Sequence, residues 1–246
     1  MDNSIVGCVL QYAGYAVEAA LVFYLVWSGR WKKLRGVAFY LASLLVAELS
    51  RGYAIHQHGV GSRQYFYVYW STDFLLVTSA FVLVCLFFRR ACLYEEKMRR
   101  FIGLFLLFTF ILVTAISTFT FIHNYRHLFF SYFIVEFNQN LYFTCLVLNT
   151  LLYLLLQYLE SADDQLGLLV CGMGIQFAGP AATFALVHLT SGESFAQSLG
   201  SLVMPICTLG TLLVWAYAIV HEKDEAVRVT RRDVPVLAEV TVNSNV

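Results

Sequence analysis

Seven long apolar stretches, separated by short polar breaks, constrain this chain more than any other feature. A helix that crosses a bilayer needs about 20 mainly apolar residues, and element boundaries read from sequence are uncertain by about two to four residues. The breaks "SGRWKKLRG", "HNYRH" and "ESADDQ" are too polar to let neighbouring stretches merge. The predicted spans are Ile5–Trp27, Gly36–His56, Phe66–Phe88, Phe101–Ile122, Leu128–Tyr158, Leu166–His188 and Ser198–Val220.

The composition supports a membrane protein over a soluble one. Of 246 residues, 59% are hydrophobic and 13% are charged, whereas a soluble domain carries about 25% charged residues. Lipid offers no partners to backbone groups, so a spanning segment satisfies them within a helix. The sequence therefore predicts an all-α integral membrane protein, a seven-transmembrane-helix bundle. Residues 1–220 would form the bundle and residues 221–246 a mobile cytoplasmic tail.

The basic residues predict the orientation of the bundle. Thirteen fall on one side of the predicted membrane, whereas Arg51, Arg63 and Arg126 lie at or near the other. Cytoplasmic loops carry an excess of Lys and Arg, so we expect the amino terminus outside and the carboxyl terminus in the cytoplasm. The expected location is a cell membrane, either a plasma membrane or a bacterial inner membrane. The thirteen are Arg30, Lys32, Lys33, Arg35, Arg89, Arg90, Lys97, Arg99, Arg100, Lys223, Arg228, Arg231 and Arg232.

Ionisable residues inside the predicted spans mark the candidate site. Each costs about 2.5–3.5 kcal/mol at a helix centre on insertion scales, so we expect them to face the bundle interior or water. The helical rise places them between the membrane midplane and the outer surface. Asn140 shares a face with the last of them, four residues earlier, while Asn138 points elsewhere. The candidate ligand-binding or proton-binding residues are Glu18, Glu48, Arg51, Asp73, Glu136 and Asn140.

The balance of charge among these residues suggests more than helix pairing. The second and third spans form a hairpin, so Arg51 and Asp73 can meet at one depth, and Glu48 can reach the same guanidinium. A salt bridge between two helices would account for the presence of only one of the four acids. Four acids against one arginine require protons, a cation, a cationic ligand or water. We therefore expect an outward-facing polar pocket, with helix packing as the alternative.

Four histidines are weak candidates for a metal site. Their H-x-H and H-x3-H spacings can place imidazoles on one metal ion, but no patterned carboxylate accompanies them, and solvated histidines at the interface are the simpler interpretation. They are His56, His58, His123 and His127. No CxxC or CxxCH motif indicates a zinc ribbon or covalent haem, and the last span lacks the lysine that retinal requires. We expect no cofactor.

The leading functional hypothesis is a sensor or receptor-like subunit. The chain lacks the Asp-Arg-Tyr and Asn-Pro-x-x-Tyr signatures of G-protein-coupled receptors. It resembles bacterial seven-helix sensory modules in topology alone. Such a protein would signal through its basic loops and tail to a separate cytoplasmic or membrane partner.

Three alternatives remain open. The first is a small transporter or proton-coupled permease, and the second is a structural subunit of a membrane complex. The third, a metal-dependent membrane enzyme, is disfavoured. Nucleic acid is not an expected partner, because 16 basic and 16 acidic residues cancel.

Overall fold

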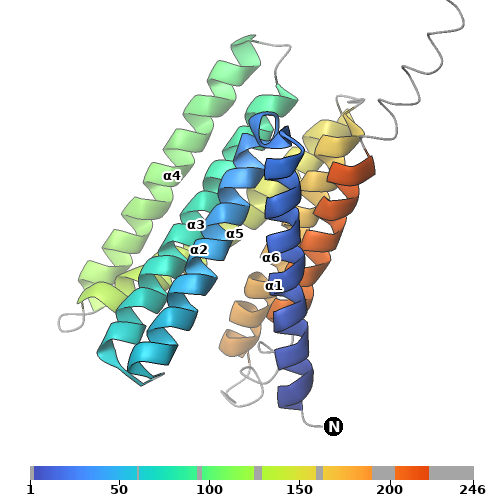
Figure 1. Ribbon diagram of the computed structural model, residues 1–246. Coiled ribbons are helices and arrows are strands. Elements are labelled where there is room, and N and C mark those ends of the chain that lie inside the picture. Colours follow the sequence, from blue (N-terminus) through green and yellow to red (C-terminus); the bar gives the residue numbers. More distant parts are fainter. Residues whose placement is uncertain are drawn as a thin grey trace, which may run out of the picture.

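The chain folds into a bundle of long helices, as the apolar stretches predict. The computed structural model describes residues 3–59, 61–92, 96–124, 129–158, 163–189 and 203–221, and Figure 1 shows their arrangement. Beyond His221 the expected tail lies outside these residues. The helices are α1 (Asn3–Trp27), the short 3-10 helix η1 (Arg30–Lys32), α2 (Arg35–His58), α3 (Arg63–Ala91), α4 (Glu96–Asn124), α5 (Phe129–Tyr158), α6 (Asp164–Leu189) and a last helix, Val203–His221.

Six helices are long and apolar enough to cross a membrane, whereas seven were expected. The seventh, α2, falls short of the six in hydropathy because Glu48 and Arg51 lie within it. The six qualifying segments indicate a multi-pass membrane protein in a lipid bilayer. They are Val9–Trp27, Arg63–Ala91, Lys97–Phe119, Phe133–Tyr158, Asp164–Thr183 and Val203–His221.

The least apolar of the long helices is covered by its neighbours. α2 packs against both α1 and α3, and α3 also contacts α4, α5 and α6. α4 lies at the edge of the bundle, where it contacts α5 and α3 and leaves a broad apolar surface exposed (Figure 1). Such a surface is expected where a helix faces lipid. Fully buried residues of the core include Leu41, Val84, Leu141, Leu169 and Met173.

A tight connection between α2 and α3 positions the polar residues on both helices. Gly59 ends α2 with a φ of 76°, a conformation that glycine adopts without strain. Ser62 then caps α3, because its side chain accepts a hydrogen bond from the backbone nitrogen of Tyr65. The two helices are thereby held as an antiparallel hairpin, which brings Arg51 of α2 beside the early turns of α3.

The last helix is fixed to α6 by a buried tryptophan. Trp215 is 0% exposed, and its indole nitrogen donates to the carbonyl oxygen of Leu169 at 3.0 Å. A Cβ added at Gly172 would lie 2.6 Å from the indole ring, so the ring occupies space that only glycine leaves open. The Tyr40 ring of α2 meets the indole edge-on at 5.7 Å between centroids. Trp215 therefore joins α2, α6 and the last helix.

Candidate functional site

The predicted contact between Arg51 and Asp73 is present. Arg51 Nη2 lies 3.4 Å from Asp73 Oδ1, and Arg51 Nε donates to Thr72 Oγ1 at 2.8 Å. The guanidinium carbon also sits 4.5 Å from the centroid of the Tyr69 ring, which adds a cation–π contact. One arginine of α2 is thus held by three residues of α3 that lie within little more than one helical turn.

A side chain from α5 completes this group. Asn138 Nδ2 donates to Asp73 Oδ2 at 2.5 Å, and the side chain is 1% exposed. We call Arg51, Tyr69, Thr72, Asp73 and Asn138 the ion-pair cluster. Sequence analysis placed Asn138 away from Glu136 and left it out of the site. The structure shows that its face, and not that of Glu136, meets α3.

A second polar group lies between α1 and α2. Glu48 was expected to reach Arg51, but its Oε2 accepts a hydrogen bond from the Tyr15 hydroxyl at 2.8 Å. That hydroxyl in turn accepts from Gln11 Nε2 at 2.5 Å. Glu18 follows Tyr15 by one turn and lies within electrostatic range of Glu48. We call Glu18 and Glu48 the carboxylate pair.

Glu18 is the most deeply enclosed acid among the described residues. Its side chain is 2% exposed, and Oε1 has no hydrogen-bond partner there. A carboxylate buried without a partner loses its hydration and gains nothing in return. Such an oxygen is typical of a position that water or an ion occupies.

Three residues that sequence analysis missed lie near the two groups. Tyr40 of α2 is 4% exposed and lies within electrostatic range of Glu18 of α1 and near Gln176 of α6. Tyr142 of α5 lies within electrostatic range of Asp73 and of Tyr40. Gln176 could have been identified from the sequence, because it is a carboxamide in the middle of an apolar stretch. The tyrosines gave no signal, because aromatic residues are common throughout this sequence.

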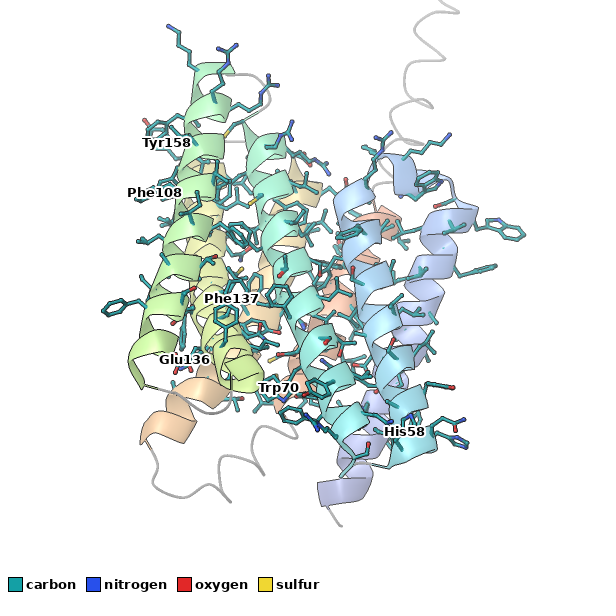
Figure 2. All side chains as sticks on the ribbon, turned by 90° about the vertical axis from the view of Figure 1, so that its left-hand side faces the viewer. His58, Trp70, Phe108, Glu136, Phe137 and Tyr158 are labelled. Carbon is teal, nitrogen blue, oxygen red and sulfur yellow. The ribbon has the colours of Figure 1, made fainter. Side chains whose placement is uncertain are left out.

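Glu136 and Asn140 lie apart from both groups. Asn140 Nδ2 donates to Ser117 Oγ of α4 at 3.0 Å, so this face of α5 is turned toward α4. Glu136 precedes Asn140 by one turn and has no hydrogen-bond or ion-pair partner among the described residues. Figure 2 shows Glu136 on α5, separated from Trp70 of α3. The structure gathers Glu18, Glu48, Arg51 and Asp73 around α2, and it leaves the other two predicted residues on the far side of α5.

The structure gives the histidine hypothesis no support. His56 and His58 are exposed at the end of α2, while His127 and the side chain of His123 lie outside the described residues. Within the part of the chain that is described, no group of three or more His, Cys, Asp or Glu residues could hold a metal ion.

The opposite end of the bundle carries a different arrangement, the basic-end clamp of Arg90, Asp163 and Gln165. Arg90 Nε and Nη2 donate to the two Asp163 oxygens at 3.0 and 3.1 Å, a bidentate pair. Asp163 also caps α6 by accepting from Leu166 N at 3.0 Å. Gln165 accepts from Arg90 at 3.1 Å and donates to the Ala218 carbonyl oxygen at 3.4 Å. Asp163 belongs to the break "ESADDQ", so one acid of that break pairs with Arg90 in the last turn of α3.

Buried oxygen atoms without partners run along the bundle interior. Leaving such an atom unsatisfied costs about 1–3 kcal/mol, and buried water or an ion commonly relieves that cost. Five are found among the described residues: Glu18 Oε1, Thr78 Oγ1, Asn138 Oδ1, Asn149 Oδ1 and Gln176 Oε1. In the part of the bundle that the structure describes, these five oxygens are therefore left without a donor.

Comparisons of the chain with protein-family models, with curated proteins and with solved structures found no significant match in any of the three.

Proposed function

We propose that the protein is a seven-span membrane sensor or receptor-like subunit, which binds a small ligand or protons in its polar interior and signals through a separate partner. The observation that carries this proposal is the position of the charges. The carboxylate pair and the ion-pair cluster lie within helices, where charges are expensive, and each contains a buried oxygen, Glu18 Oε1 or Asn138 Oδ1, that has no hydrogen-bond partner among the described residues.

The packing of α2 supports its role as the seventh span. A helix that carries Glu48 and Arg51 would be unstable against lipid, but α1 covers one side of α2 and α3 covers another. Tyr15 and Thr72, from those two helices, bind the two charges. Protein therefore replaces water around both side chains, and a less apolar helix can cross the bilayer inside the bundle.

The ends of the bundle support the proposed orientation. Figure 2 shows long nitrogen-tipped side chains gathered at the end opposite to His58 and Trp70. Arg30, Lys32 and Arg90 belong to that end, which would face the cytoplasm by the positive-inside rule. The amino-terminal end of α1 and the α2–α3 connection would then face outward (Figure 1).

A chain of contacts supports signalling from the polar interior to the basic end. Tyr40 lies within electrostatic range of Glu18, and its ring meets Trp215 edge-on. One turn beyond Trp215, the Ala218 carbonyl oxygen accepts from Gln165, and the Ile219 carbonyl oxygen accepts from Arg30 of η1. A shift at Tyr40 would therefore reach the basic loops through the last helix.

Trp215 provides a direct test. In a Trp27→Phe/Trp31→Phe/Trp70→Phe background, its emission is recorded in bilayer discs while pH, salt and a panel of small solutes are varied. We expect at least one of these conditions to shift or quench the emission. The same condition should have no effect after Glu48→Gln or Asp73→Asn, and its effect should persist after Glu136→Gln. A response that survives in both site variants, or no response under any condition, would contradict the proposal.

A second candidate function is a small transporter. The observation that favours it is Asn149, which follows Asn138 by three turns of α5 toward the basic end and also keeps an unpartnered oxygen. Together with Thr78 and Gln176 it extends the polar interior beyond the charged groups. Proton flux into liposomes that depends on Asp73 and is reduced by Asn149→Leu would favour transport over sensing.

A further inference from the structure

Two arginines at the basic end of the α2–α3 hairpin have no acidic partner. Arg35 is the first residue of α2 and Arg89 lies in the last turn of α3, so both belong to the same end of the bundle. Both are exposed, and neither side chain forms a hydrogen bond or an ion pair with any residue that the structure describes. Arg90, the next residue of α3, is by contrast held by Asp163. Two guanidinium groups are therefore available to an acceptor from outside the chain.

A glycine brings the two helices together beside these arginines. A Cβ added at Gly36 would lie 2.8 Å from Leu86 Cδ1, so α2 approaches Leu86 this closely because Gly36 has no side chain. Arg35 directly precedes Gly36 in the sequence. Arg89 follows Leu86 by about one turn. Both arginines consequently lie near the seam between α2 and α3, just beyond the point of close approach.

An exposed apolar surface continues from the arginines along the seam. Phe39 follows Arg35 by four residues, a spacing that places both on one face of α2. On α3, Leu86 and Val82 precede Arg89 by three and seven residues and share its face in the same way. All three apolar side chains are exposed. Because α3 is long and apolar enough to cross a membrane, this surface would face lipid.

Two tryptophans indicate the depth of the arginines in the membrane. Trp27 is the last residue of α1, Trp31 lies within η1, and both are exposed at the basic end. Tryptophan is enriched at the interface between membrane and water, at the level of the lipid headgroups. Lys32 lies over the Trp31 ring, 5.9 Å from its centroid. Arg35 begins the helix that follows this segment, so its guanidinium lies at headgroup depth.

Phosphate is the acceptor that suits guanidinium groups at this depth, because a guanidinium donates two parallel hydrogen bonds to phosphate oxygens. We propose that Arg35 and Arg89 bind the headgroup phosphate of one anionic phospholipid, whose acyl chain lies along the seam over Phe39 and Leu86. Net negative charge on the lipid complements two cations that no acid of the described chain neutralises. A soluble anion would leave the apolar seam unused.

This inference goes beyond the proposed function. It requires α3 to span the bilayer, and it is independent of any signalling role. The lipid would bind at the opposite end of the hairpin from the ion-pair cluster.

Brominated lipids measure which phospholipid occupies the seam, because bromine quenches a tryptophan that it contacts. The reporter Phe39→Trp is placed in the Trp27→Phe/Trp31→Phe/Trp70→Phe background, in which Trp215 is fully buried. The full chain is reconstituted in phosphatidylcholine with increasing amounts of brominated phosphatidylglycerol. We expect the reporter to prefer phosphatidylglycerol over brominated phosphatidylcholine by at least about tenfold.

Two controls separate a specific site from general attraction to the basic end. The reporter Phe101→Trp lies on α4, one turn after the exposed Lys97, and should show a much smaller preference, because one lysine is a point charge without a guanidinium. With the Phe39→Trp reporter, Arg35→Gln/Arg89→Gln should abolish the preference, whereas Lys97→Gln should keep it. Equal preference at the two reporters, or a preference that survives Arg35→Gln/Arg89→Gln, would overturn the inference.

Two further measurements complete the test. Millimolar inorganic phosphate should leave the quenching unchanged, and relief of quenching by phosphate would indicate a soluble-anion site instead of a lipid site. The wild type needs no reporter: its melting temperature in phosphatidylcholine micelles should rise along a saturation curve as phosphatidylglycerol is added. No rise would contradict the lipid site. None of these results bears on the response of Trp215, so the sensor proposal stands or fails separately.

Discussion

The two ends of this bundle place their charges in contrasting settings. At the basic end, Arg90 and Asp163 lie where helices end, and the clamp they form with Gln165 also caps α6 and reaches the last helix. In the polar interior, the charges lie within helices, and two oxygens of these groups, Glu18 Oε1 and Asn138 Oδ1, have no hydrogen-bond partner among the described residues. The first arrangement connects helix ends and uses every group it holds. The second leaves binding capacity unused.

The difference indicates which charges matter for function. The clamp at the helix ends is only partly buried, because Arg90 and Asp163 are 23% and 34% exposed. Arg51 and Asp73 are 16% and 22% exposed, and they are surrounded by groups from α2, α3 and α5. Substitutions in the two regions should therefore differ in size, in salt dependence and in their effect on ligand response.

The largest expected loss of stability follows Asp73→Ala. Removing one partner of an enclosed ion pair leaves the other charge uncompensated, which costs about 3 kcal/mol. Reversible unfolding in mixed micelles measures the change in the free energy of unfolding. Asp73→Asn serves as the control, because it keeps the size of the side chain and an acceptor for Asn138. A loss below about 1 kcal/mol for Asp73→Ala would show that the pair behaves as an exposed one.

Asn138→Ala should cost about 1–3 kcal/mol, because Asp73 Oδ2 then loses its donor inside the bundle. The same unfolding assay compares it with Asn140→Ala, which removes a neutral hydrogen bond to Ser117 and should cost about 1 kcal/mol. If the two variants are equal, Asn138 is an ordinary interhelical contact.

Arg90→Ala should cost about 1 kcal/mol or less, because the pair with Asp163 is partly exposed. Salt screens exposed pairs more than enclosed ones. High salt should therefore reduce the difference between Arg90→Ala and the wild type, while the loss caused by Asp73→Ala should change little. Equal salt sensitivity of the two variants would remove the contrast between the two ends.

Glu136→Gln should have the smallest effect, within about 0.5 kcal/mol of the wild type. Glu136 has no hydrogen-bond or ion-pair partner among the described residues and faces away from α3. Thermal unfolding of the purified protein measures this. A loss comparable to that of Asp73→Ala would place Glu136 in the site after all.

The sequence predicted the helices and the pair of Arg51 with Asp73, because length, hydropathy and a short hairpin connection are local properties. It did not predict which face of α5 meets α3. A helix that is apolar almost all round has no polar stripe to orient it, so sequence analysis chose Asn140, which shares a face with Glu136, over Asn138. Glu48 was assigned to Arg51 on helix spacing. Glu48 instead accepts a hydrogen bond from Tyr15 of α1. Spacing along α2 cannot predict a partner on another helix.

The contacts of Trp215 with Tyr40 and with Leu169 were also beyond prediction. They depend on how α2, α6 and the last helix approach one another, and Gly172 permits that approach by leaving space for the indole ring. A single glycine in an apolar stretch is compatible with many packings. Only the three-dimensional structure shows which of these residues are in contact.

The most direct test of a functional role for the ion-pair cluster replaces its polar groups with apolar ones of similar size. Replacing a complete buried ion pair in this way is often neutral or stabilising, so Arg51→Met/Asp73→Leu/Asn138→Leu separates stability from response. Emission of Trp215 is measured in this variant under the condition to which the wild type responds. We predict a folded protein, at least as stable as the wild type, in which the emission no longer responds. A variant that keeps the response would contradict a functional role for the cluster and leave it as helix packing.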